Sequence, residues 1–259
     1  HLPGKGLNTF AEHLYDFGLG APIGIDYPTE KGGNVPSAAY YDKLYKRRRG
    51  WRSPTIMSIG IGQGEIQLTT LQMANLATII ANKGSYFIPH LVKDYADGVT
   101  KIEERFQKKH QVKISPEHFL PIIDGMQRVV LYGTGRKAAI PGISVAGKTG
   151  TSQNPHGEDH SVFFGFAPVD KPVIAIAVII ENAGKGAEFA APIASLMIEK
   201  YIKKDVSRVA LAQTMEQINT LKIKPKRKIL PKHFNLTADS TANTAVEQEQ
   251  INLPENSED

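Results

Sequence analysis

Apolar residues recur at helical spacing in two long stretches of the first half of the chain. The first follows Thr69 or Thr70, either of which can cap a helix, and it ends at Asn82-Lys83-Gly84, where glycine favours the left-handed conformation of a helix end. The second begins at Ser115-Pro116 and ends at Gly133-Thr134-Gly135. A shorter helix is predicted near residues 9–17. The positions expected to face the core are Leu71, Ala74, Ala77 and Ile80 in the first helix, and Phe119, Ile122, Met126, Val129 and Val130 in the second.

The pattern changes to β-forming residues in the second half of the chain. Residues 143–146, 161–167 and 173–180 are strand-like, and a turn at 168–172 with a proline at each end joins the last two. Short links between strands favour an antiparallel sheet covered by helices, so we expect an α/β fold of the α+β type. A last helix is predicted over 191–202. Its expected inward side chains are Ile193, Leu196, Met197 and Tyr201.

Composition narrows the classes of protein. The 259 residues are 41% hydrophobic and 22% charged, which suits a globular chain with a sizeable core. The absence of cysteine excludes disulfides, thiolate catalysis and cysteine zinc sites. A net charge of +5 does not demand nucleic acid. Residues 1–221 are predicted to form one folded domain, and 222–259 a disordered polar tail.

One motif has two interpretations. Residues 142–149 match the phosphate-loop pattern G-x-x-x-x-G-K-[ST], but such a loop must follow a buried strand and open a helix. Residues 136–141 do not have a strand pattern, and Gly-Thr-Ser-Gln-Asn-Pro at 150–155 cannot start a helix. We therefore reject nucleotide binding and interpret residues 145–151 as a strand.

That strand contains Lys148-Thr149-Gly150-Thr151, and K-T-G is a signature of β-lactamases and penicillin-binding proteins. Along a strand, Lys148 and Gly150 point to one face, and Thr149 and Thr151 to the other. Lys148 can supply a fixed cation, the missing side chain of Gly150 lets a peptide lie close, and the threonine hydroxyls can bind a carboxylate. The backbone N–H of Thr151 can stabilise an oxyanion, which contributes about 3–4 kcal/mol per donor in other enzymes.

Further motifs surround this strand. The chain resembles the elongation-type class B penicillin-binding proteins, that is, penicillin-binding protein 2, over about residues 14–201. The segments that carry the resemblance are Phe17-Gly18-Leu19-Gly20, Gly24-Ile25-Asp26-Tyr27-Pro28 with Glu30, Ser58-Ile59-Gly60-Ile61-Gly62-Gln63-Gly64, Thr69-Thr70-Leu71-Gln72-Met73-Ala74-Asn75, Asn82-Lys83-Gly84, Gly133-Thr134-Gly135, Ala146-Gly147-Lys148-Thr149-Gly150-Thr151, and Asp159-His160 through Phe163-Phe164-Gly165-Phe166-Ala167-Pro168.

The resemblance implies a serine transpeptidase/β-lactamase-like fold and a serine acyl-enzyme mechanism without metal or organic cofactor. The implied substrate is a peptidoglycan stem peptide ending in D-Ala-D-Ala, and β-lactams would acylate the same serine. It also implies the periplasmic side of the inner membrane, an anchor upstream of this chain, and cell-elongation membrane proteins as partners. No nucleic-acid partner is expected.

The chain departs from the family in its first two motifs. No serine begins an S-x-x-K tetrapeptide, and we identify no S-x-N tripeptide. Thr134 to Lys137 has T-x-x-K spacing, which we attribute to chance because it follows a helix end. The expectation is therefore a transpeptidase domain whose N-terminal part is missing, and which is inactive by itself.

Two alternatives stay open: a β-lactamase or β-lactam sensor of the same fold, and a non-catalytic binding module. His156 and His160 are four residues apart, but Pro155 and Gly157 argue against a helix, so we expect a loop between two strands and no metal. The basic aromatic segment 43–52 is interpreted as a solvated loop rather than an RNA-binding surface.

Overall fold

The computed structural model describes residues 2–46, 50–96 and 99–217, so the predicted tail at 222–259 lies outside them. In chain order the helices are α1 (Leu2–Asp16), α2 (Ala38–Leu44), α3 (Thr70–Ala81), α4 (Glu104–Gln107), α5 (Phe119–Leu131), α6 (Ala190–Lys203) and α7 (Val209–Gln217), with short 3-10 turns at η1 (Ser53–Ile56), η2 (Ser58–Ile61), η3 (Pro116–His118) and η4 (Arg136–Ala138). The strands are β1 (Ser85–Phe87), β2 (Lys109–Gln111), β3 (Ala146–Ser152), β4 (His160–Ala167) and β5 (Ile174–Ile180).

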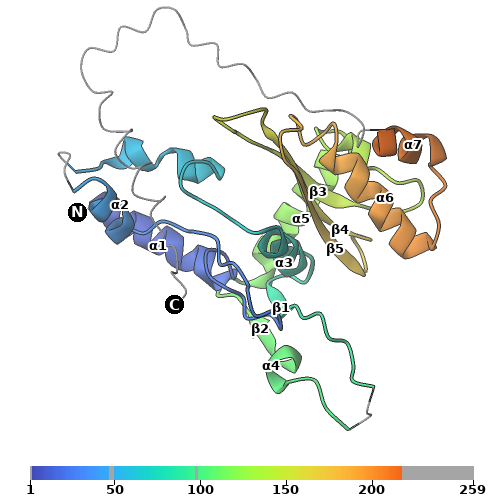
Figure 1. Cartoon of the computed structure of the whole chain (residues 1–259), viewed down its shortest axis with the longest axis horizontal. Helices are drawn as coiled ribbons and strands as arrows, with labels where there is room; N and C mark the ends of the chain where they lie inside the picture. Colours follow the sequence, from blue (N-terminus) through green and yellow to red (C-terminus); the bar gives the residue numbers. More distant parts are fainter. Residues whose placement is uncertain (1, 47–49, 97–98, 218–259) are drawn as a thin grey trace, which may run out of the picture. The chain divides into compact units, whose positions relative to one another are not determined.

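The main sheet is antiparallel and has the strand order β3-β4-β5. Figure 1 shows α6 on one side of this sheet and α3 on the other. Phe163 and Ala167 of β4 join the core under α6, whereas Phe166 joins the core formed with α3 and α5. Because successive strand side chains point to opposite faces, β4 is buried on both sides. The expected antiparallel sheet between helices is confirmed.

The two long helices of the first half are present, with one correction. The side chain of Thr69 accepts a hydrogen bond from the backbone N–H of Gln72, so Thr69 is the cap of α3. Helix α5 is preceded by the 3-10 turn η3 and buries Phe119, Met126 and Val130. Ile122, expected in the core, is 52% exposed, because Ile123 packs inward instead.

Helix α6 is rotated relative to the expected orientation. Met197 and Tyr201, predicted to face inward, are more than half exposed. The buried face carries small side chains instead, with Ile198 and the carboxylate of Glu199. Alanines allow the helix to lie close to the sheet, and large apolar side chains at helical spacing were therefore a poor guide to the buried face.

The basic aromatic segment 43–52 is a solvated loop only in part. Lys43 and Leu44 end α2 and Trp51 is buried, whereas Lys46 and Arg52 are exposed, and residues 47–49 lie outside the described residues. Tyr41 and Trp51 are buried and form a small core with Leu7 and Ile59. The Trp51 indole N–H donates to Asp42 at 2.7 Å. Because the Trp51 ring is buried, it cannot stack on nucleic acid bases.

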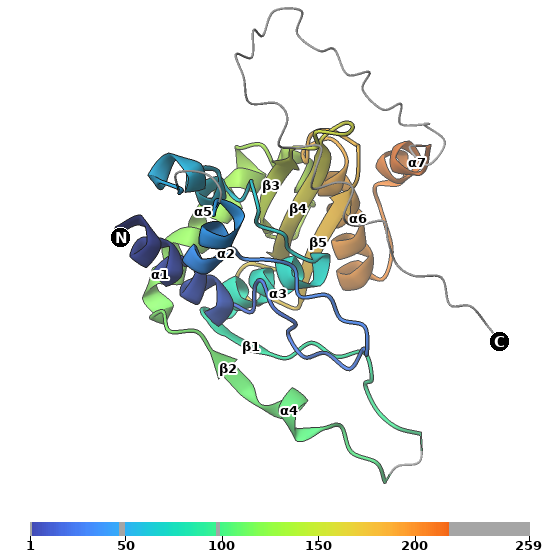
Figure 2. The same ribbon diagram turned by 60° about the vertical axis from the view of Figure 1, so that its left-hand side comes forward.

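Strands β1 and β2 form a separate two-stranded antiparallel ribbon, and Figure 2 shows this ribbon and α4 extending away from the main sheet. No helix in the described ranges is both long and apolar enough to cross a membrane.

Candidate active site

Strand β3 carries the K-T-G-T tetrapeptide at one edge of the main sheet. It pairs with β4 along its whole length, so that Lys148 lies opposite Phe164, Thr149 opposite Phe163 and Gly150 opposite Val162. The strand continues to Ser152, which confirms that these residues do not form a phosphate-binding loop.

Exposure along β3 differs from residue to residue rather than between its two faces. Lys148 is exposed, although Ala146 on the same face of the strand is buried. The Lys148 ammonium group donates to the carbonyl of Thr149 at 2.7 Å. Thr151 is exposed and Gly150 is partly exposed, whereas Thr149 is only 9% exposed. The structure therefore presents Lys148, Gly150 and Thr151 to a ligand more openly than Thr149.

The hydroxyl of Thr149 has a partner that the sequence did not reveal. The hydroxyl of Thr134 lies 2.6 Å from it. Thr134 sits in a tight turn after α5, in which the backbone N–H groups of Gly133 and Gly135 both donate to the carbonyl of Val129. A Cβ on Gly133 would lie 2.9 Å from the Cα of Val129, so glycine is needed there. In the sequence, Gly133-Thr134-Gly135 indicated a helix end and one segment of the family resemblance, but no contact with β3.

The segment between β5 and α6 also packs closely against the backbone of β3. A Cβ on Gly186, in the segment between β5 and α6, would collide with the carbonyl oxygens of Gly150 and Val162. Ser161 fixes this segment, because its hydroxyl donates to the carbonyl of Lys185 and accepts from the N–H of Ala190. The close approach explains a glycine at position 186.

The glycine-rich segment before α3 meets the other end of the strand. The side-chain amide of Gln63 donates to the carbonyl of Thr151 at 3.1 Å, across 88 positions of sequence. This contact brings the Ser58–Gly64 stretch and the K-T-G-T strand to one place.

The segment between β3 and β4 is a loop, as expected, and His160 begins β4. The ring of His160 accepts a hydrogen bond from the N–H of Asn182 at 3.0 Å, and Asn182 also accepts from the side chain of Asn154 at 2.7 Å. The His160 ring is thus hydrogen-bonded to the segment after β5, to which Asn154 of the loop also bonds. Among the described residues, no group of three or more histidine and acidic side chains could hold a metal ion.

The chain does contain one S-x-N tripeptide, Ser152-Gln153-Asn154. The expectation that no S-x-N is present was therefore wrong. The tripeptide begins at the last residue of β3, directly after K-T-G-T, rather than upstream of the glycine-rich segment. It is therefore not the second motif of the family.

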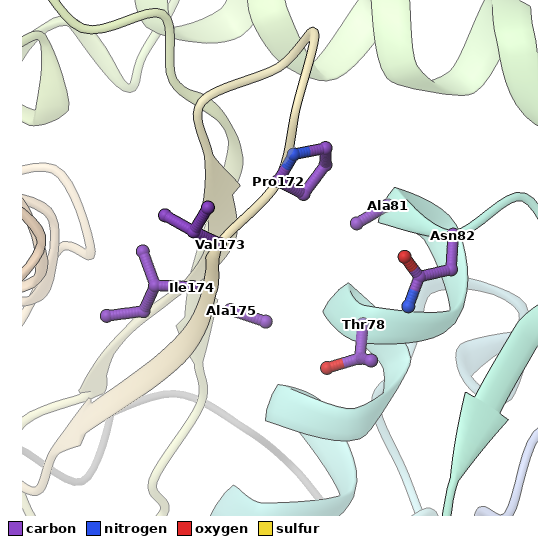
Figure 3. A pocket seen from close by; sticks show the side chains of 7 residues that line it. All are labelled: Thr78, Ala81, Asn82, Pro172, Val173, Ile174 and Ala175. Atoms are coloured by element: carbon purple, nitrogen blue, oxygen red, sulfur yellow. The ribbon is translucent and has the colours of Figure 1, made fainter. Parts of the chain in front are cut away.

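A pocket of about 220 Å³ lies elsewhere on the molecule. Figure 3 shows Thr78 and Ala81 of α3 and its C-cap Asn82 opposite the chain from Pro172 to Ala175 at the start of β5. No ionisable side chain lines it, and β5 is at the opposite edge of the sheet from β3. The pocket is separate from the candidate active site.

Comparisons with known proteins agree with this geometry. The peptidoglycan D,D-transpeptidase MrdA of Haemophilus influenzae is 34% identical over 250 residues, which cover 83% of this chain and 37% of that protein. The chain therefore spans little more than a third of the length of that relative. The resemblance to penicillin-binding protein 2 is confirmed.

Solved structures give the same result for the fold. A crystal structure of Pseudomonas aeruginosa PBP2 in complex with WCK 5153 has a TM-score of 0.66 and 31% identity, covering 79% of this chain and 45% of that chain. A chain of a peptidoglycan synthase complex has a TM-score of 0.65 and 27% identity, covering 79% of this chain and 34% of that chain. The expected serine transpeptidase fold is confirmed. Residues 5–199 match the penicillin binding protein transpeptidase domain, and the chain belongs to that family.

Proposed function

We propose that this chain supplies the substrate-binding wall of a peptidoglycan D,D-transpeptidase. The observation that carries the proposal is the place of β3 at the edge of the main sheet, with Lys148 and Thr151 exposed and no side chain at Gly150. An extended peptide can add to such an edge through main-chain hydrogen bonds. A stem peptide that ends in D-Ala-D-Ala is a ligand of this kind.

Each residue of the tetrapeptide has a proposed role. The ammonium group of Lys148 provides the fixed positive charge of the proton-transfer network. The N–H of Thr151 donates to the oxyanion, and its hydroxyl donates to the terminal carboxylate of the peptide. Thr149 completes the set: when Thr134 is the donor in their hydroxyl pair, the Thr149 hydroxyl keeps its own proton for a ligand. Gly150 lets the peptide approach the strand.

The proposed reaction is acyl transfer through a serine ester. The serine oxygen attacks the carbonyl carbon between the two D-alanines, the C–N bond breaks, and the terminal D-alanine leaves with a proton on its amine. An amine of a second stem peptide then attacks the ester carbon and releases the serine. The nucleophilic serine and its general base belong to motifs that this chain does not contain, and we place them in another part of the natural protein. No metal or organic cofactor is needed.

We further infer that the natural protein acts on the periplasmic side of the inner membrane, with an anchor outside this chain. Cell-elongation membrane proteins are the proposed partners. The 27% identity to a chain of a peptidoglycan synthase complex supports this choice.

Labelling by a fluorescent penicillin tests the proposal. The natural protein, expressed with the sequence that precedes this chain, is expected to form a stable covalent adduct, while residues 1–217 alone are expected to remain unlabelled. A labelled band for residues 1–217 would show that a serine of this chain is the nucleophile. Absence of labelling in the longer protein would contradict the transpeptidase function and favour a non-catalytic binding module.

The lifetime of the adduct distinguishes the remaining alternative. A transpeptidase holds the acyl group for a long time in the absence of an acceptor amine, whereas a β-lactamase needs an added base that activates water. Hydrolysis of the adduct within seconds would favour a β-lactamase.

A further inference from the structure

We propose that Gln63 is a positioning residue for the substrate strand, and that it sets the orientation of Thr151 by holding the carbonyl of that residue. The inference rests on the proposed function, because Thr151 is there the oxyanion donor. The hydrogen bond from the Gln63 amide to the Thr151 carbonyl is 3.1 Å long and joins segments 88 residues apart.

The end of β3 needs such a contact. Strand β3 is at the edge of the main sheet and has a strand partner, β4, on one side only. Ser152 is its last residue, so Thr151 lies next to the point where regular pairing stops. Residues at a strand end lose order more easily than residues in the middle, unless another contact holds them.

The Gln63 side chain comes from a well-braced turn. Gly62 and Gly64 on either side of it have φ angles of 74° and 72°, in the left-handed region that favours glycine. The N–H of Gln63 donates to the carbonyl of Ser58 at 3.1 Å. A Cβ on Gly64 would lie 2.7 Å from the hydroxyl of Ser58, so the turn is closely packed. The two glycines thus allow a tight turn that directs the Gln63 amide toward β3.

The same turn is anchored on its other side. Two residues after Gln63, the carboxylate of Glu65 accepts a hydrogen bond from the hydroxyl of Tyr41, which is fully buried. The carbonyl of Glu65 accepts from the side chain of Asn34 at 2.6 Å. Gln63 therefore extends from a segment that is held by Tyr41 in the small core around α2. Through its hydrogen bond to Thr151, this fixed segment holds the end of β3 in place.

Holding the Thr151 carbonyl restricts the groups proposed to act on the substrate. The carbonyl, the N–H and the side chain of Thr151 are all attached through one Cα, and a fixed carbonyl limits the rotation about ψ. Preorganised donors stabilise developing charge because they need no reorientation during the reaction. Loss of the Gln63 amide is therefore expected to slow acylation without removing any group that touches the substrate.

The test uses the natural protein with its upstream sequence and compares Gln63→Ala and Gln63→Glu with Gln107→Ala. The glutamate is nearly isosteric but cannot donate to a carbonyl. Gln107 is a matched control, since its side-chain amide donates to the carbonyl of Ile102 at 3.0 Å on an exposed surface of α4. Rapid-mixing kinetics with fluorescent penicillin give both the acylation rate constant and the fraction of protein that reacts. Hydrogen exchange of the peptide that spans residues 149–152 reports its order.

We expect both Gln63 variants to lower the acylation rate constant about three- to tenfold, with faster exchange in residues 149–152 and no change in Gln107→Ala. A variant that is merely less stable would lose reactive fraction, while its remaining folded molecules would react at the normal rate constant. That result, or an unchanged rate constant, would overturn the positioning role. Failure of the unmodified protein to be labelled would instead overturn the proposed function.

Discussion

The hydroxyl groups of Thr134 and Thr149 lie 2.6 Å apart and join the turn after α5 to strand β3. Thr149 is nearly buried, so neither water nor the solvent-exposed neighbours of β3 can readily replace this partner. The pair connects the core of the sheet to the residues proposed to bind substrate.

Replacing Thr134 by valine keeps the shape of the side chain and removes the hydroxyl. We expect the natural protein to lose about 1–3 kcal/mol of unfolding free energy, because the Thr149 hydroxyl is left without its partner. Urea unfolding measures the loss. The double variant Thr134→Val/Thr149→Val should lose less than the sum of the single variants, and strict additivity would show that the two hydroxyls do not interact.

Replacing Gly186 by alanine should disturb β3, because the new Cβ would collide with the carbonyls of Gly150 and Val162. We expect a lower unfolding free energy, by about 1–3 kcal/mol, and slower labelling by fluorescent penicillin. Gly125→Ala in α5 is the control. Nothing lies within 4 Å of a Cβ there, and alanine in a helix interior should raise stability by about 0.5–1 kcal/mol. Equal effects of the two substitutions would contradict the close approach at Gly186.

Glu199 predicts a pH dependence of stability. Its carboxylate is fully buried and accepts hydrogen bonds from Arg208 at 2.8 Å and Ser207 at 2.6 Å, with Lys203 at 3.3 Å. Burial raises the pKa of Glu199, but these partners outweigh burial and lower the pKa to about 2, against an ordinary value of 4.5. A depressed folded-state pKa stabilises the fold above the unfolded value, and that stability is lost as the pH falls from 4.5 toward 2.

Glu199→Gln should flatten this pH dependence and lower the unfolding free energy at pH 7. The loss is expected to be about 3–5 kcal/mol, because Arg208 loses its charged partner. Urea unfolding at a series of pH values compares the two proteins. If both lose stability in parallel between pH 4.5 and 2, the buried carboxylate is not responsible.

The tetrapeptide itself gives the most direct activity prediction. Thr151→Val removes the hydroxyl and keeps the backbone N–H, so we expect a reduction of roughly tenfold in acylation by a penicillin with a free carboxylate. Lys148→Ala should reduce acylation by at least about a hundredfold, since it removes the fixed charge. Rapid-mixing kinetics on the natural protein measure both. A Lys148→Ala variant as reactive as the unmodified protein would remove Lys148 from the proposed mechanism.

Local signals in the sequence were sufficient for much of the fold. Thr69 caps α3, and the strands predicted at 161–167 and 173–180 are β4 and β5 within one residue at each end. Helix capping and runs of β-forming residues act over a few positions, so they can be recognised without knowing what packs nearby. The same holds for Lys148-Thr149-Gly150-Thr151, whose strand conformation followed from its immediate neighbours.

Which face of a helix is buried depended on the packing partner. Met197 and Tyr201 are exposed, while Ala190, Ala191, Ala194 and Ile198 pack in the core with the sheet, because the distance between α6 and the sheet decides which side chains fit. Trp51 lies in the basic segment 43–52, whose sequence indicated a solvated loop, yet its ring is buried in a small core with Leu7, which is distant in sequence.

The sequence by itself determined the family, the antiparallel sheet and the tetrapeptide that the proposed substrate contacts. Only the tertiary structure decided what holds that tetrapeptide in place: Thr134 beside Thr149, Gly186 against Gly150, and Gln63 on the carbonyl of Thr151. A motif is local, so spacing reveals it. Its supports come from segments 15 to 88 positions away, and nothing in their own sequence indicates which strand they reach.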